Sequence, residues 1–205
     1  MNNLYLNLGI AFVSALAFCL LLIPLIIRFS IRFNLVDNPN ERSVHKNPVP
    51  RLGGMGIFIS ALAGITLSRS GLEAIATWPV LFSSITILFF VGIWDDLKNI
   101  SAKLRFVIQI CCATALAATG IRLTSLYGIF GVQELTTGWQ YIITVLIITG
   151  TTNAFNLIDG IDGLAGGLAF ISIGVLTYLA YRLQLYPLVI LLLSFLGALI
   201  GFLKN

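Results

Sequence analysis

Two acidic and two carboxamide side chains stand close together in the segment 153–167, which reads NAFNLIDGIDGLAGG and lies between two long apolar runs. They are Asn153, Asn156, Asp159 and Asp162, and no Lys or Arg accompanies them within the segment. Ionisable groups beside membrane-length apolar segments are costly and usually mark a functional site. Carboxylate and amide oxygens are hard ligands that suit Mg²⁺ or Mn²⁺. We interpret the segment as an oxygen-rich binding pocket; the alternative is a polar loop that water alone satisfies.

A second acidic pair, Asp95-Asp96, closes another apolar run, and Lys98, Lys103 and Arg105 follow it closely. A carboxylate at a membrane edge can act as a general base or help to hold a cation. The alternative is an ordinary helix end, where acids and bases pair at the interface. A second acidic segment elsewhere in the chain favours the functional interpretation, because titratable groups with chemical roles cluster at sites.

The polar segment 30–52 contains three prolines and many charged residues, which predicts a loop. It carries His45, Lys46 and Arg51 just before Gly53-Gly54. Basic side chains next to a Gly-Gly pair suit a phosphate ligand, through their charge and through close approach of the backbone. The alternative is that these positive charges serve only membrane orientation and contact with anionic lipid.

The elements that must position these groups are membrane helices. The chain has 205 residues, of which 58% are hydrophobic and only 10% charged, and its mean hydropathy is +0.99. This composition excludes a soluble globular domain. We predict an all-α, polytopic transmembrane bundle that forms one domain over residues 1–205. About seven apolar runs approach the length that spans a bilayer: Leu4–Phe29, Gly53–Ser68, Trp78–Trp94, Lys103–Thr119, Trp139–Phe155, Leu164–Tyr181 and Tyr186–Phe202.

Two stretches between these runs are less apolar. Residues 69–77 are expected to be a short connection, and residues 120–138 partly alternate between apolar and polar, which suggests a small hairpin or surface loop. The three cysteines all lie in apolar runs, so we interpret them as packing residues rather than as a disulfide framework.

The positive charges predict the orientation in the membrane. If the N-terminus lies outside, nine of the 12 Lys and Arg residues fall on the cytoplasmic side, as expected for a multi-pass protein. All three polar segments described above then open on the cytoplasmic face. Acids for a metal, bases for phosphates and an adjoining bilayer together indicate transfer of a nucleotide-bound group to a lipid phosphate.

Three motifs carry a resemblance to a known family. They are KNPVPRLGG at 46–54, GIWDD at 92–96 and NAFNLIDGIDGLA at 153–165. The chain resembles the polyprenyl-phosphate N-acetylhexosamine-1-phosphate transferases, and within them the undecaprenyl-phosphate N-acetylglucosamine-1-phosphate transferases. The resemblance implies an enzyme of the bacterial inner membrane that starts a cell-envelope polysaccharide, such as lipopolysaccharide or teichoic acid. Its substrates would be a UDP-sugar and undecaprenyl phosphate, its cofactor Mg²⁺ or Mn²⁺, and no nucleic-acid partner is expected.

The resemblance also implies roles for single residues. Asp95 and Asp96 match the catalytic aspartate pair, and Asn156 matches an asparagine that contacts the metal. Asp159 and Asp162 match acids of the nucleotide-sugar pocket, and Asn153 joins them as a substrate-binding candidate. Two basic residues complete the expected substrate-binding set: Lys46, which matches a first-loop lysine, and Arg105, which stands where the family more often has lysine.

Members of the family continue for several more helices and supply a further metal-binding aspartate and a histidine-rich motif. We therefore expect this chain to correspond to the N-terminal part of such a transferase. The alternative is a shortened, non-catalytic membrane relative that binds a ligand or a partner chain.

Overall fold

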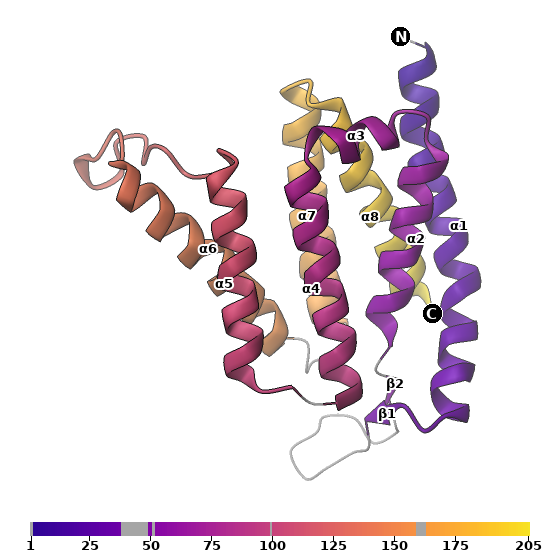
Figure 1. Cartoon of the computed structure of the whole chain (residues 1–205). Helices are drawn as coiled ribbons and strands as arrows, with labels where there is room; N and C mark the ends of the chain where they lie inside the picture. The colour runs from indigo at the N-terminus through magenta and orange to yellow at the C-terminus, as the bar shows by residue number, and fades with distance from the viewer. Residues whose placement is uncertain (1, 38–48, 51, 99, 159–162) are drawn as a thin grey trace. The chain divides into compact units, whose positions relative to one another are not determined.

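The computed structural model describes residues 2–37, 49–50, 52–98, 100–158 and 163–205. Helices make up most of this part of the chain, and one small sheet pairs β1 antiparallel to β2. The elements, labelled in Figure 1, are α1 (Asn2–Arg32), β1 (Val36–Asp37), β2 (Val49–Pro50), α2 (Gly53–Leu67), α3 (Gly71–Thr77), α4 (Pro79–Lys98), α5 (Ala102–Ala118), the 3₁₀ turn η1 (Ile129–Gly131), α6 (Thr137–Ile158), α7 (Leu164–Arg182) and α8 (Tyr186–Lys204).

Each of the seven predicted membrane runs forms a helix, namely α1, α2, α4, α5, α6, α7 and α8. Five of them are individually long and apolar enough to cross a membrane: α1, α4, α6, α7 and α8. The pair α2–α3 qualifies as a sixth span when the two helices are taken together across a bend of 106°. The remaining helix, α5, has 17 residues. The prediction of an all-α, multi-pass helical bundle is confirmed.

The short connection expected at residues 69–77 is instead a helix over most of its length, α3. The segment GLEAIAT contains good helix formers, but seven residues are too few for a periodic pattern to be recognised. The sharp turn into α3 depends on Gly71, where an added Cβ would lie 1.7 Å from the carbonyl oxygen of Ile65. The first helix also runs to Arg32, beyond the expected end at Phe29.

The stretch between α5 and α6 forms the predicted small hairpin. Ser125 and Glu134 make an antiparallel bridge, and the backbone N–H of Leu126 donates to the carbonyl oxygen of Gln133 at 2.9 Å. The turn η1 lies inside this hairpin.

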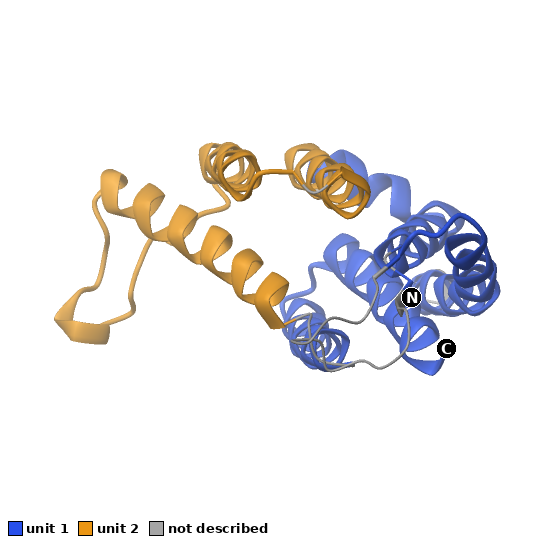
Figure 2. Cartoon of the chain, turned by 90° about the horizontal axis from the view of Figure 1, so that it is seen from below, with its two compact units in different colours: residues 1–78, 159–205 blue, residues 79–158 orange. Residues whose placement is uncertain are grey.

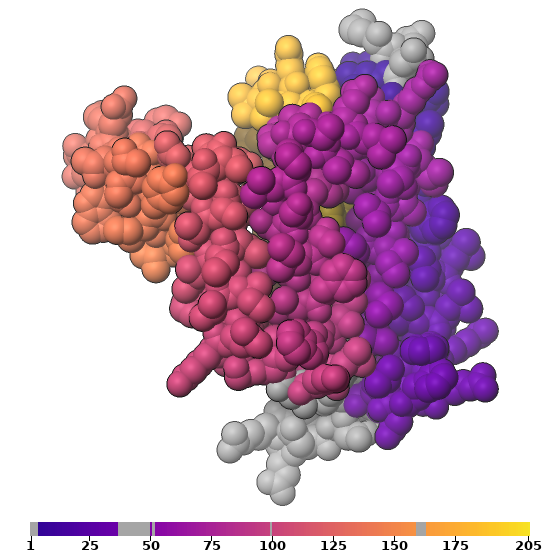
Figure 3. All heavy atoms as spheres, in the orientation of Figure 1, coloured from indigo at the N-terminus to yellow at the C-terminus, as the bar shows by residue number. Residues whose placement is uncertain are grey.

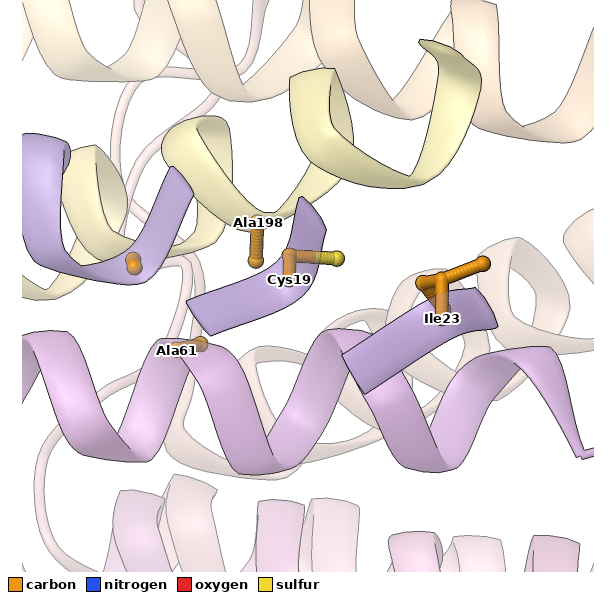
Figure 4. Packing of buried hydrophobic residues seen from close by; sticks show 5 residues of the cluster. Cys19, Ile23, Ala61 and Ala198 are labelled. Carbon is orange, nitrogen blue, oxygen red and sulfur yellow. The ribbon is translucent and has the colours of Figure 1, made fainter. Parts of the chain in front are cut away.

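The contacts divide the chain into two compact units, coloured separately in Figure 2. Unit 1 contains residues 1–78 and 159–205, and its described helices are α1, α2, α3, α7 and α8. Its core lies where α1 packs against α2 and α8. Figure 4 shows Cys19 of α1 beside Ala198 of α8, with Ala61 of α2 on the other side of α1. Small side chains allow the three backbones to approach closely, as is common between membrane helices.

Unit 2 contains residues 79–158, with α4, α5, the hairpin and α6. In this unit α5 packs against both α4 and α6. Because successive helices run in opposite directions, the end of α4, the start of α5 and the end of α6 lie at the same, lower end of unit 2 in Figure 1. The acidic pair Asp95-Asp96, the base Arg105 and the first part of the polar segment 153–167 therefore lie at one end of a single unit.

Candidate active site

Five of the eight predicted site residues fall on unit 2. Asp95 and Asp96 lie in the last turn of α4, Arg105 lies in the first turn of α5, and Asn153 and Asn156 lie near the end of α6. The other three, Lys46, Asp159 and Asp162, lie outside the described residues. The described part of the candidate site therefore consists of the five residues on unit 2.

A tight link between α4 and α5 sets the first part of the site. Helix α4 ends at Lys98, whose positive charge suits a helix C-terminus. Helix α5 begins after Ser101, whose hydroxyl oxygen accepts a hydrogen bond from the backbone N–H of Leu104 at 3.3 Å. This serine cap satisfies one of the otherwise unpaired N–H groups of the first turn. The link leaves the last turn of α4 facing the first turn of α5.

Asp95 and Arg105 form an ion pair across this link. Nη1 of Arg105 donates a hydrogen bond to Oδ2 of Asp95. The side chain of Asp95 is 22% exposed and that of Arg105 is 24% exposed, so the pair is partly shielded from solvent. A charge-assisted hydrogen bond in such a setting is stronger than one on the open surface. The predicted catalytic acid Asp95 and the predicted substrate-binding residue Arg105 are thus direct neighbours, and Asp96 beside them is exposed.

A second polar contact lies one helical turn further along α5. Nδ2 of Asn153 donates to Oε1 of Gln109 at 2.7 Å and to the carbonyl oxygen of Thr149 at 2.8 Å. Gln109 is only 4% exposed. A buried carboxamide needs a partner because desolvating it unpaired costs free energy. This contact fixes the side chain of Asn153 and joins α5 to α6.

Gln109 was not among the predicted site residues. Its partner Asn153 is 44 positions away, so no local pattern reveals the contact. The available signal is its spacing: Gln109 follows Arg105 by four residues, which places both on one face of α5. Helix α5 therefore presents one polar face that holds α4 through Arg105 and α6 through Gln109.

Asn156 extends this arrangement toward the end of α6. It follows Asn153 by three residues and so shares its side of the helix. Its side chain is exposed and makes no hydrogen bond with the rest of the described chain. The side-chain oxygen of Asn156 is thus not engaged by the described residues, in contrast to the amide of Asn153, which is held by Gln109.

The side-chain oxygens at the lower end of unit 2 are of the types that bind a hard divalent cation. They comprise the carboxylates of Asp95 and Asp96 and the carboxamide of Asn156, which are the donor types that Mg²⁺ accepts. Among the described residues, no three His, Cys, Asp or Glu side chains gather into a metal-binding group. Mg²⁺ often takes only one or two protein ligands and completes its shell with water and substrate phosphates, so the donor types of these three side chains are compatible with such an ion.

The contact between Gln109 and Asn153 leads to a first prediction. Replacing Gln109 with leucine keeps the volume but leaves Nδ2 of Asn153 with one acceptor, so we expect the free energy of unfolding to fall by about 1 kcal/mol. Thermal unfolding in detergent would measure the loss. The control is Gln133→Leu, because Gln133 is exposed. Combining Gln109→Leu with Asn153→Leu should cost less than the sum of the single changes; an additive result would contradict the contact.

The comparisons with known proteins concern the same part of the chain. Residues 78–204 match glycosyl transferase family 4, and this range includes all five described site residues. The chain is 37% identical, over 172 residues, to a probable undecaprenyl-phosphate N-acetylglucosaminyl 1-phosphate transferase of Bacillus subtilis, covering 83% of this chain and 48% of the relative. It is 34% identical to an undecaprenyl-phosphate alpha-N-acetylglucosaminyl 1-phosphate transferase of Yersinia pestis, covering 76% of this chain and 42% of the relative.

A third relative is the decaprenyl-phosphate N-acetylglucosaminephosphotransferase of Mycolicibacterium smegmatis, which is 30% identical over 86% of this chain and 48% of its own length. The chain thus spans slightly less than half the length of these curated relatives. The family match covers more than half of the chain and confirms the resemblance that the three motifs indicated. The chain belongs to glycosyl transferase family 4.

Proposed function

We propose that this protein transfers N-acetylglucosamine-1-phosphate from UDP-N-acetylglucosamine to undecaprenyl phosphate, as the first step of a cell-envelope polysaccharide. The observation that carries the proposal is the polar face of α5. It holds the acid Asp95 through Arg105 and the carboxamide Asn153 through Gln109, at one end of a unit whose helices α4 and α6 are long and apolar enough to cross a membrane. The three relatives, 30–37% identical to this chain, are named as undecaprenyl-phosphate or decaprenyl-phosphate transferases, which supports the lipid acceptor.

The proposed reaction is a displacement at phosphorus. An oxygen of the lipid phosphate attacks the phosphorus that carries the sugar in the donor. The bond from that phosphorus to the bridging oxygen of the diphosphate breaks, and UMP leaves with that oxygen. The product is a lipid diphosphate that carries N-acetylglucosamine. In such transfers, positioning and charge stabilisation supply most of the catalysis.

Different residues of unit 2 have different roles in the proposed reaction. Asp95 or Asp96 accepts the proton of a monoanionic lipid phosphate and so frees the attacking oxygen. Arg105 holds Asp95 in place, and its guanidinium has further N–H donors that suit phosphate oxygens. Gln109 holds the amide of Asn153, and we expect the side-chain oxygen of Asn153 to contact the donor. Lys46, Asp159 and Asp162 are expected to contact the nucleotide sugar.

A divalent cation belongs to this proposal. The oxygens of Asp95, Asp96 and Asn156 are suited to Mg²⁺ or Mn²⁺. When bound, the ion would neutralise charge on the donor diphosphate. We propose that Asn156 is the residue through which α6 holds the ion, because its exposed carboxamide is not used by the rest of the described chain.

The role of Asn156 can be tested by titration calorimetry in detergent. We expect this chain to bind Mg²⁺ weakly without nucleotide and more tightly with UDP-N-acetylglucosamine, because the diphosphate adds oxygen ligands. Asn156→Ala should weaken the nucleotide-assisted binding by about tenfold. Asn7→Ala, which changes a carboxamide on α1, is the control. Tight Mg²⁺ binding that needs no nucleotide and survives Asn156→Ala would place the metal elsewhere.

The proposed orientation puts this site on the cytoplasmic side of the bacterial inner membrane, with the N-terminus outside. Positive charge supports it, because Lys98, Lys103 and Arg105 all lie at the site end of unit 2, whereas Arg122 lies at the hairpin end. In intact cells, a membrane-impermeant maleimide should label Ser125→Cys directly and Lys103→Cys only after permeabilisation. The parent protein, treated in the same way, shows how much of the labelling comes from the native cysteines. Labelling of Lys103→Cys in intact cells would show that the protein has the opposite orientation in the membrane.

The transfer itself is tested with purified protein, Mg²⁺, labelled UDP-N-acetylglucosamine and undecaprenyl phosphate. We expect a lipid-linked diphosphate sugar and one UMP for each product molecule. UDP-glucose in place of the donor, and omission of the lipid, are the controls. Binding of both substrates without any product would overturn the catalytic proposal in favour of a relative that only binds its ligands.

A further inference from the structure

The hairpin between α5 and α6 exposes an apolar tip that no described residue covers. Tyr127 is 84% exposed, Ile129 61% and Phe130 94%. Phe130 and Tyr127 adopt φ values of 57° and 51°, in the left-handed region that large side chains rarely enter. The strain indicates that the hairpin is shaped to present these side chains outward.

The backbone of the same hairpin is satisfied internally. The N–H of Gly128 donates to the carbonyl oxygen of Val132 at 3.0 Å, and the N–H of Leu135 donates to that of Thr124 at 2.9 Å. The N–H of Gly131 in turn donates to the carbonyl oxygen of Gly128 at 3.0 Å. Internal pairing of this kind is what a segment needs where water is scarce.

The base of the hairpin is fixed to the helix ends. Nε of Arg122 donates to Oε1 of Gln140 at 2.8 Å, and its guanidinium lies 5.2 Å from the ring centre of Tyr141. The N–H of Leu123 donates to the hydroxyl of Thr144 at 2.9 Å. The single arginine of the hairpin is thus bound at its base, away from the apolar tip, and the tip is carried on a rigid support.

The length of α5 indicates what the tip meets. Its 17 residues give a helix of about 26 Å, shorter than the roughly 30 Å hydrocarbon core. A helix of this length that starts at one membrane interface ends at about the depth of the other. In Figures 1 and 2 the hairpin extends sideways from the ends of α5 and α6, and in Figure 3 it forms part of a lobe that projects beside α5. Trp139, 57% exposed at the start of α6, adds an aromatic residue of the kind found at membrane interfaces.

We propose that the hairpin is a membrane anchor whose tip residues Tyr127, Ile129 and Phe130 lie in the lipid interface of the leaflet at the end of α5. The bilayer is the same one that α4 and α6 are long and apolar enough to cross. This anchor completes the short span of α5 and fixes the start of α6. It does not depend on the proposed transferase activity, because it rests only on the hairpin and its two helices.

The test places an environment-sensitive fluorophore on the tip. Phe130→Cys in the full chain is labelled with a nitrobenzoxadiazole maleimide and reconstituted into nanodiscs of phosphatidylcholine and phosphatidylglycerol. Glu134→Cys, on the return strand of the hairpin, is the matched control, and the unsubstituted protein measures labelling of the native cysteines. Ile129→Cys repeats the measurement with Phe130 intact, in case Phe130 is needed for folding.

We expect blue-shifted emission at positions 130 and 129, quenching by lipids that carry a nitroxide near the headgroup, and protection from aqueous iodide. The probe at 134 should be several-fold more accessible to iodide. If the tip probes are quenched by iodide as strongly as the control, the tip lies in water and the proposal is wrong. If they are shielded from both iodide and lipid nitroxide, a protein surface covers the tip, and the proposal is also wrong.

Discussion

Replacing Asp95 with asparagine is expected to lower the rate of sugar-phosphate transfer by about 10²–10⁴-fold, the range typical of losing a general acid–base group. The substitution preserves the size of the side chain and removes its charge. It also leaves Arg105, which is 24% exposed, without its ionic partner. The measurement is the formation of lipid-linked product with purified protein in the assay proposed above. Turnover equal to that of the parent protein would contradict the role of Asp95.

Two further variants separate chemistry from structural support at this ion pair. Glu134→Gln makes the same carboxylate-to-carboxamide change at the hairpin end of unit 2, so it should leave transfer unchanged. Arg105→Lys keeps the positive charge but loses the planar guanidinium, and we expect a smaller loss of rate than for Asp95→Asn. If Asp95 served only to pair with Arg105, the two substitutions would reduce rate and thermal stability in parallel. A catalytic role predicts that Asp95→Asn lowers kcat while the protein remains folded.

Much of the fold could be predicted from the sequence because long apolar runs have few physical solutions. A backbone in lipid must satisfy its own hydrogen bonds, so each run that spans a membrane becomes a helix. The same reasoning does not predict helix α3. Its position depends on close contact between Gly71 and the carbonyl oxygen of Ile65. That contact exists only once the chain has bent by 106° between α2 and α3, so the local sequence contains little sign of it.

The residue types of the candidate site could be predicted from the sequence, but most of the contacts between these residues could not. Asp95 could be recognised as a costly charge at the end of an apolar run, and Arg105 as a base close behind it. The pairing of Gln109 with Asn153 depends on how α5 packs against α6, which composition and spacing do not specify. The roles of Lys46, Asp159 and Asp162 stay predictions, because these residues lie outside the described part of the chain.

The second large effect is expected in the packing of unit 1, where α8 lies against α1. A Cβ added at Gly197 would lie 2.3 Å from the carbonyl oxygen of Phe12 and 3.2 Å from the backbone nitrogen of Leu16. These neighbours are backbone atoms of a helix, so they cannot rotate away as the end of a side chain could. A larger residue at Gly197 must therefore push the two helices apart and disturb the buried cluster that includes Cys19 and Ala198.

We expect Gly197→Val to lower the free energy of unfolding by about 3 kcal/mol, the upper end of the usual cost of overpacking, because the obstructing atoms are backbone. The matched control is Gly174→Val in α7, where nothing lies within 4 Å of an added Cβ. Valine has a higher helix propensity than glycine, so the control should be neutral or slightly stabilising. Thermal unfolding in detergent, followed by circular dichroism, would compare the two variants. Equal melting temperatures would mean that α1 and α8 do not approach as closely as the contacts at Gly197 require.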